Sequence, residues 1–135
     1  MVGILIVSHH RLAEAAKETV SLIVGERENL SFLPIMKNDR PEDFAAKLKQ
    51  KRAEADRGDG VLILADMFGG TPSNVSLALF ANDDKVSVIT GFNLPLVMEA
   101  VMHSGKPLAE MTELLMSRRD KTIIDAKAMM RKAGR

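Results

Sequence analysis

The amino-acid sequence predicts a single α/β domain over residues 1–135, a doubly wound, mainly parallel sheet with helices on both faces. Four short apolar runs rich in β-branched residues alternate with segments of helical periodicity, which is the pattern of successive βαβ units. The run at 61–65 has no polar member, as expected of a strand buried on both faces. For strand order 2-1-3-4, the switch point lies between the first and third strands, where ligands collect at the carboxyl ends.

The individual elements follow from apolar periodicity and from start and stop signals. In chain order, they are a strand at 2–7, a helix with apolar residues from 12 to 23, a strand at 30–35, a helix opening at 39–41, the strand at 61–65, a short helix from 71 to about 80, a strand at 86–90, a helix from 94 to 102, and two helices around 108–115 and 123–130. Gly25 suits the end of the first helix, and Pro34 indicates an edge strand. Apolar spacing predicts a core-facing stripe of Leu94, Val97, Met98, Val101 and Met102. The methionines at 98, 102, 111, 116, 129 and 130 are interpreted as core filling.

Composition excludes several classes of function. A net charge of +1 and the absence of Trp and Tyr argue against a nucleic-acid surface. The chain has no Cys, so it offers no thiolate nucleophile and no disulfide framework. The apolar opening lacks the basic flank of a signal peptide, and no run is long enough to cross a bilayer. We therefore expect a cytoplasmic protein.

Polar residues follow two of the predicted strands at their carboxyl ends. Ser8-His9-His10 follows the strand at 2–7, and Asp66 follows the strand at 61–65. Because these are the first and third strands, His9 and Asp66 are expected to face one another across the switch point. A carboxylate that accepts the proton of one ring nitrogen fixes the tautomer and leaves the other nitrogen as a nucleophile.

The residues after Asp66 suit an anion beside that nitrogen. Gly69-Gly70 permits positive φ and close backbone approach. Thr71-Pro72 is typical of a helix start, with the Thr71 hydroxyl at the N-cap and Pro72 at the first helical position. A helix start offers free N–H groups to an anion, so the stretch suits a phosphoryl group on a histidine.

Two other readings of these residues are a turn without chemistry and a metal site using His9, His10 and Asp66. The metal site is disfavoured because adjacent side chains on an extended backbone point to opposite sides. The exposed apolar pair Met67-Phe68 is a candidate docking contact for a partner. His103 is interpreted as a surface residue near a helix C-terminus.

Three motifs resemble those of the mannose-family IIA component of the bacterial phosphoenolpyruvate:sugar phosphotransferase system (PTS). They are Ser8-His9-x-x-Leu12-Ala13-Glu14, Asp66-Met67-Phe68-Gly69-Gly70-Thr71-Pro72-x-Asn74 and Gly91-Phe92-Asn93-Leu94-Pro95. The resemblance covers essentially the whole chain, and the motifs fall at matching spacings. It implies a parallel sheet with an added or exchanged C-terminal edge strand, and a homodimer with the final helices or an exchanged segment at the interface.

The resemblance also implies a phosphocarrier. His9 would accept a phosphoryl group from phospho-HPr and pass it to a IIB component for sugar uptake, and Asp66 would orient His9. Gly69, Gly70 and Thr71 would steady the phosphate, with possible support from Ser8, His10 and Asn93. No cofactor or metal is implied, because the phosphoryl group arrives on a protein. The implied partners are HPr, IIB, a second copy of the chain and a membrane IIC/IID complex, without nucleic acid or direct membrane insertion.

Two departures from the family pattern affect this interpretation. His10 stands where the family usually has glycine, which makes the acceptor ambiguous, although the motif register favours His9. If that position is left-handed, histidine tolerates it better than most residues, at some cost. Ser73 replaces a bulkier residue and would alter the partner surface. The alternative function, a regulatory protein whose phosphorylation is read without sugar transport, uses the same site.

Overall fold

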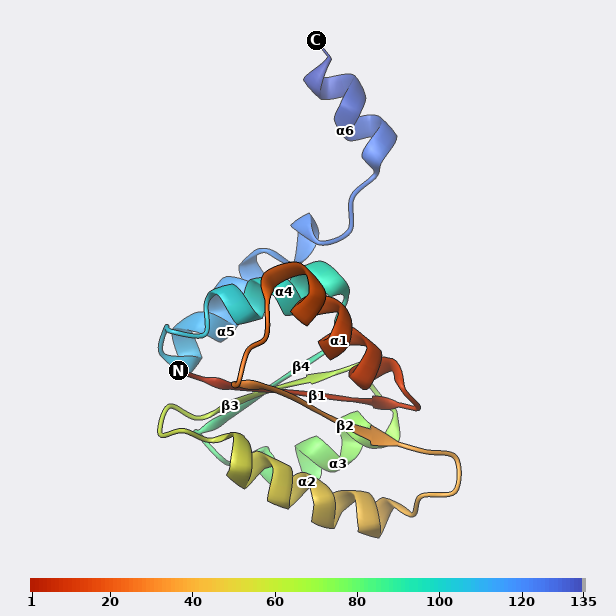
Figure 1. Ribbon diagram of the computed structural model, residues 1–135, viewed down its shortest axis with the longest axis vertical. Helices are drawn as coiled ribbons and strands as arrows, with labels where there is room; N and C mark the ends of the chain where they lie inside the picture. Colours follow the sequence, from red (N-terminus) through yellow and green to blue (C-terminus); the bar gives the residue numbers. More distant parts are fainter. Residues whose placement is uncertain (135) are drawn as a thin grey trace.

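A computed structural model describes residues 1–134, and its four strands form one parallel sheet in the order β2-β1-β3-β4. The strands are β1 (Gly3–His9), β2 (Leu30–Ile35), β3 (Val61–Ala65) and β4 (Val86–Thr90). Helices α1 (Leu12–Val24), α4 (Leu94–Met102) and α5 (Leu108–Ser117) cover one face, and α2 (Pro41–Ala55) and α3 (Thr71–Phe80) cover the other (Figure 1). The predicted fold class, strand order and edge position of β2 are confirmed.

The two central strands separate two apolar cores. Along β1, Ile4 and Ile6 face the α1, α4 and α5 layer, whereas Leu5 and Val7 face the α2 and α3 layer. Successive side chains of a strand point to opposite faces, so a strand covered on both sides needs apolar residues at every position. This explains the unbroken run of β3, all five of whose residues are buried.

Helix α4 buries a different stripe from the predicted one. Leu96, Val97, Ala100 and Val101 are its buried residues, whereas Met102 is 67% exposed. Asn93 caps the helix by accepting the Leu96 N–H, and this start turns the 96, 97, 100 and 101 positions toward the sheet. The prediction was therefore right for the two valines and wrong for Leu94 and Met102.

Most of the methionines interpreted as core filling are on the surface. Met111 is fully buried, but Met102, Met116, Met129 and Met130 are exposed. The prediction was wrong for these four because an apolar residue at helical spacing is buried only where its helix has a neighbour on that side.

The C-terminal segment leaves the packed body. After the short helix η1 (Arg119–Lys121), α6 (Ala126–Ala133) projects away from the sheet (Figure 1), and none of its residues is buried. The implied C-terminal edge strand was wrong for residues 126–133, because their composition of Ala, Lys, Met and Arg favours helix and includes no β-branched residue. Within residues 1–134, no helix combines the length and apolarity needed to cross a membrane.

The turn between α2 and β3 is built on the carboxylate of Asp56, the residue that ends α2. Asp56 Oδ1 accepts the N–H groups of Gly58 (2.8 Å) and Gly60 (3.1 Å), and Arg52 donates to Oδ2 (3.1 Å). The Gly58 hydrogen bond, with help from Gly60 and Arg52, outweighs burial and lowers the pKa of Asp56. The ionised carboxylate thus fixes the entry into the central strand.

Candidate functional site

His9 and Asp66 meet at the carboxyl edge of the sheet, as predicted. Parallel pairing sets Val7 opposite Ala65, so the chains leave β1 and β3 side by side. Asp66 Oδ2 lies 2.9 Å from the backbone nitrogen of His9 and 2.9 Å from its ring Nδ1. The Asp66 side chain is 10% exposed and the His9 side chain 47% exposed. The carboxylate therefore holds both the backbone and one side of the ring, and the rest of the ring faces outward.

The hydrogen bonds of Asp66 define the tautomer of His9. Its other oxygen, Oδ1, accepts the Met67 N–H at 3.0 Å, and its own N–H donates to the Val7 carbonyl at 3.2 Å. An ionised carboxylate only accepts hydrogen bonds, so Nδ1 carries the ring proton and Nε2 presents a lone pair. That arrangement makes Nε2 a nucleophile.

Gly70 lies directly against the His9 ring. A Cβ added at Gly70 would overlap Cε1 of His9 and lie 3.1 Å from Nε2. Any side chain at this position would displace the ring or the loop, so the close approach requires glycine. Gly69, with φ of 92°, needs glycine for a different reason, its left-handed backbone.

The start of α3 differs by one residue from the prediction. Gly70 is the N-cap, with extended backbone and no side-chain cap, so Thr71 is the first helical residue and its hydroxyl does not cap the helix. The first helical hydrogen bond runs from the Asn74 N–H to the Gly70 carbonyl at 2.8 Å, and the Asn74 side chain donates to the Gly69 carbonyl at 3.2 Å. Asn74 thus closes the glycine loop, a role that its position in the motif did not reveal.

The turn after His9 is held by a buried serine. Ser8 Oγ accepts the Ala13 N–H at 2.7 Å and donates to the His10 carbonyl at 3.2 Å. The His10 N–H donates to the Ile35 carbonyl at 2.8 Å. His10 has φ of 54°, a left-handed conformation. Ser8 therefore supports the site through the backbone.

This turn also changes the argument about a metal. The reason given against a metal site assumed extended backbone at both histidines, whereas His10 is left-handed. Within residues 1–134, no group of three or more His, Cys, Asp or Glu side chains is arranged to hold a metal ion.

Two residues assigned to the site or to its surface have other roles. Asn93 Oδ1 accepts the Leu96 N–H, and its Nδ2 donates to Thr122 Oγ1, each at 3.0 Å. Both polar atoms of Asn93 are thus used to cap α4 and to hold the C-terminal segment. Ser73 is completely buried in the first turn of α3, so the prediction that it alters a partner surface was wrong.

Other exposed candidates behave as predicted. His103 lies at the end of α4, where Nε2 is 3.2 Å from Glu99 Oε2. Met67 and Phe68, beside the catalytic edge of the sheet, are 53% and 74% exposed. A flexible apolar pair at this position is available to a docking protein.

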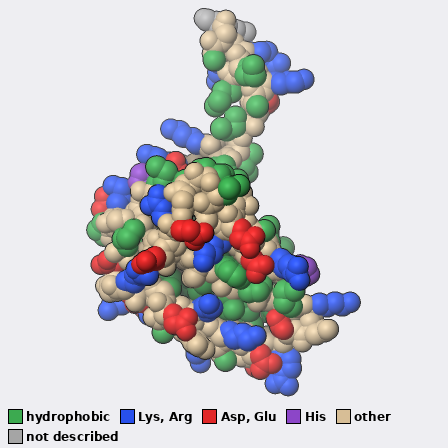
Figure 2. Space-filling model, in the orientation of Figure 1, with side chains coloured by type: hydrophobic (Ala, Val, Ile, Leu, Met, Phe, Trp, Pro, Cys, Tyr) green, Lys and Arg blue, Asp and Glu red, His purple; other side chains and the backbone are tan. Residues whose placement is uncertain are grey.

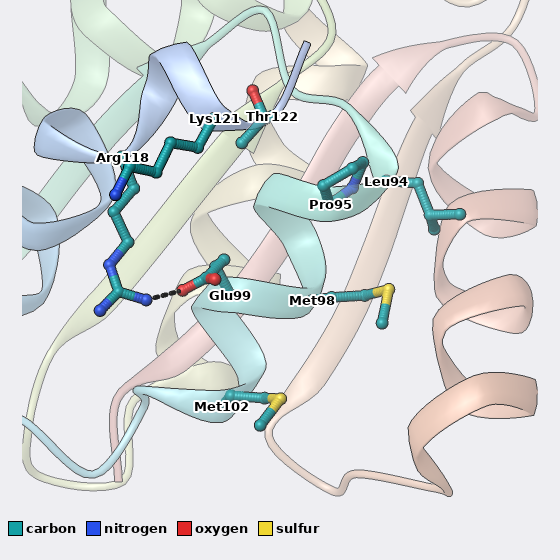
Figure 3. A pocket seen from close by; sticks show the side chains of 8 residues that line it. All are labelled: Leu94, Pro95, Met98, Glu99, Met102, Arg118, Lys121 and Thr122. Carbon is teal, nitrogen blue, oxygen red and sulfur yellow. Dashed lines mark hydrogen bonds and ion pairs between the residues drawn. The ribbon is translucent and has the colours of Figure 1, made fainter. Parts of the chain in front are cut away.

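A larger apolar groove lies away from His9, between α4 and the segment 118–122 (Figure 3). It encloses about 600 Å³, and its lining includes Leu94, Met98 and Met102. Arg118 closes one side by donating to Glu99 Oε2 at 2.8 Å. The misassigned residues of α4 are therefore the apolar wall of this groove.

Comparison with known proteins agrees with this geometry. A family model described as "PTS system fructose IIA component" matches residues 3–122. The fructose-specific EIIA component of Bacillus subtilis (strain 168) is 32% identical over 101 residues, covering 75% of this chain and 69% of the relative. The mannose-specific EIIAB component of Escherichia coli (strain K12) is 30% identical over 101 residues, covering 75% of this chain but 31% of that longer protein.

A solved structure shows the same relation in three dimensions. The IIA protein associated with the fucose utilization operon of Streptococcus pneumoniae superimposes with a TM-score of 0.86 at 30% identity, covering 96% of this chain and 99% of the other. The fold, the matched length and the sequence identity lead to one conclusion. This chain belongs to the mannose-family IIA components of the phosphotransferase system, a family that transfers phosphoryl groups between proteins.

Proposed function

We propose that this chain is a phosphocarrier in which Nε2 of His9 accepts a phosphoryl group from phospho-HPr and passes it to a IIB component. The observation that carries the proposal is the contact between Nδ1 and Asp66, 2.9 Å long, which leaves Nε2 free above Gly70. The acceptor acts within a cytoplasmic domain spanning residues 1–135 and needs neither a metal nor a cofactor.

The proposed transfer balances without another reactant. The Nε2 lone pair forms the new bond to phosphorus, the bond between phosphorus and the donor protein breaks, and its electron pair stays with the donor. The proton on Nδ1 remains hydrogen-bonded to Asp66, which stabilises the positive charge that develops on the ring. Gly69, Gly70 and Thr71 lie before the first bonded turn of α3, where N–H groups are available to the phosphoryl oxygens.

The test is incubation with phosphoenolpyruvate, Enzyme I and HPr, followed by intact mass and site mapping. We expect one acid-labile phosphoryl group on His9, its loss in His9→Ala, and its retention in His10→Gly. Glycine is the matched control because it adopts the left-handed backbone of residue 10 without strain. Phosphate mapped to His10, or full labelling of His9→Ala, would contradict the assignment.

A second step separates transport from regulation. Mixing the phosphorylated protein with the IIB component of a mannose-type system should move the label to IIB. Retention of the label on His9 with every IIB tested would favour the regulatory alternative, in which a partner reads the phosphorylation state.

We further propose that the chain forms a homodimer through its C-terminal segment. Helices as short as α6 are marginal when isolated in water, and its neighbourhood exposes Ile123 (80%), Ile124 (50%), Met129 (55%) and Met130 (74%). Figure 2 shows apolar side chains along this projection. The α4 groove of a second copy, walled by Leu94, Met98 and Met102 (Figure 3), offers a matching apolar surface. Sedimentation at micromolar concentration tests the dimer, and a monomer would contradict it.

A further inference from the structure

A pocket of about 320 Å³ adjoins the free side of His9. Its wall includes His9, His10, Lys37, Asp39 and Thr71. Lys37 and Asp39 come from the segment between β2 and α2, whereas Thr71 begins α3. Three separate stretches of chain thus converge beside the proposed acceptor, and two of them bring a basic side chain.

The backbone at His10 suggests that its side chain has a function. A φ of 54° disfavours every residue with a Cβ relative to glycine. The surrounding bonds hold it there, because the His10 carbonyl accepts from Ser8 Oγ and its N–H donates to the Ile35 carbonyl. A strained residue fixed in this way beside a reactive group is a candidate for a role in the chemistry.

We propose that His10 and Lys37 contact the phosphoryl group carried by His9 and stabilise it as cations; this rests on the proposed function of His9. Both residues line the pocket that His9 opens into. The phosphoryl group carries close to two negative charges near neutral pH, and hydrogen bonds between charged partners are the stronger kind. Neither contact involves Nδ1, so His10 and Lys37 act on the phosphorylated state without changing the Asp66 contact.

The other charges near His10 can be named. His9 and Arg11 flank it in the chain, Lys37 and Asp39 face the pocket, and Asp66 lies behind the His9 ring. The Asp39 carboxylate accepts the Met36 N–H at 2.8 Å, which ties it to its own turn and reduces its repulsion of an anion.

The two proposed cations predict different dependences on pH. Lysine remains charged throughout the range in which histidine titrates, whereas histidine gains its charge as the pH falls through about 6.5. The contribution of His10 should therefore grow from about pH 8.5 to about pH 5.5, and that of Lys37 should stay constant.

The experiment measures the equilibrium of phosphoryl exchange with phospho-HPr by intact mass of both proteins. Relative to wild type, His10→Gly and His10→Asn should shift the equilibrium toward phospho-HPr by roughly threefold to tenfold at about pH 5.5 and by less than twofold at about pH 8.5. Lys37→Met should shift it by roughly threefold at both values. Comparing variants at one pH cancels the titration of HPr and of His9.

Matched controls remove the remaining explanations. Lys49→Met deletes an exposed lysine of α2, and His103→Asn deletes a histidine at the end of α4; neither residue lines the pocket. Both should match wild type. His10→Gly relieves backbone strain and His10→Asn tolerates the same φ, so the pair separates loss of the ring from loop flexibility.

The result that overturns the proposal is an exchange equilibrium unchanged in the His10 and Lys37 variants, or a His10 effect of equal size at every pH, since a backbone effect would not follow the charge of the ring. If wild type itself takes no phosphate on His9, the proposed function fails instead. Site mapping of wild type before the exchange experiment distinguishes the two failures.

Discussion

Replacement of Asp66 by asparagine separates the electrostatic role of the carboxylate from its shape. In the native site, Oδ2 accepts from the His9 backbone and ring, and Oδ1 accepts from the Met67 N–H. An amide has one accepting oxygen, so in either orientation its NH₂ faces a backbone donor. If the NH₂ lies toward His9, it also forces Nδ1 to accept and places the ring proton on Nε2, the wrong tautomer.

The magnitude follows from these contacts. A hydrogen bond to a charged group contributes about 1.5–3 kcal/mol, which corresponds to roughly 10- to 150-fold in transfer rate. The unpaired backbone donor lies at a strand end near solvent, so Asp66→Asn should lose only about 1 kcal/mol of unfolding free energy. We therefore expect a folded protein that accepts phosphate at least 10-fold more slowly.

Rapid-quench transfer from phospho-HPr measures the rate, ¹⁵N NMR of the His9 ring reports the tautomer, and urea unfolding gives the stability. Asp39→Asn is the matched control, because Asp39 also lines the pocket beside His9 but bonds to the Met36 N–H and not to the ring. An Asp66→Asn protein with the native tautomer and the wild-type rate would refute the reasoning.

Three further predictions concern the loop, the α2–β3 turn and the assembly. Gly70→Ala should slow transfer by roughly 10- to 100-fold, because its Cβ would overlap the His9 ring; an unshifted ring resonance would contradict this. Asp56→Asn should cost about 1 kcal/mol at neutral pH in urea unfolding. Because the pKa of Asp56 is lowered in the folded protein, chiefly by the Gly58 N–H, this stabilisation is present above about pH 4 and is lost as the pH falls through the folded pKa, so the two proteins should converge at about pH 2–3. Met130→Glu should convert the proposed dimer to a monomer in sedimentation while leaving the monomer's thermal unfolding within about 0.5 kcal/mol, as expected for an exposed side chain; an unchanged dimer would exclude that face.

The sheet could be predicted from the sequence because each of its strands has a distinct chemical signature. Residues 61–65 and 2–7 are apolar at every position, which only a doubly covered strand requires. Pro34 lacks the N–H that a central strand needs, which placed its strand at the edge. Strand order then put His9 beside Asp66, since the carboxyl ends of neighbouring parallel strands lie at the same edge.

The surroundings of His9 were less predictable because they depend on loop conformation. The contact between Gly70 and the ring and the approach of Lys37 arise from backbone angles that apolar periodicity does not encode. Similarly, the stripe on α4 was misassigned because helical spacing gives an apolar face but not which edge of that face meets the core. The helical form of 126–133 was readable from its composition, whereas the family resemblance favoured a strand.

A protein that both accepts and releases a phosphoryl group needs its acceptor fixed on one side and accessible on the other. Here the fixed side is Nδ1, held by a carboxylate that is 10% exposed, and the accessible side belongs to a ring that is 47% exposed. The fixed side is set by the pairing of β1 with β3, and a slip of one residue would move Asp66 to the opposite face. The accessible side rests on Gly70, whose missing side chain lets the loop lie against the ring without covering Nε2. Orientation of the histidine therefore comes from the buried sheet, while access for two successive partners comes from the loop, and the two can be altered separately by Asp66→Asn and Gly70→Ala.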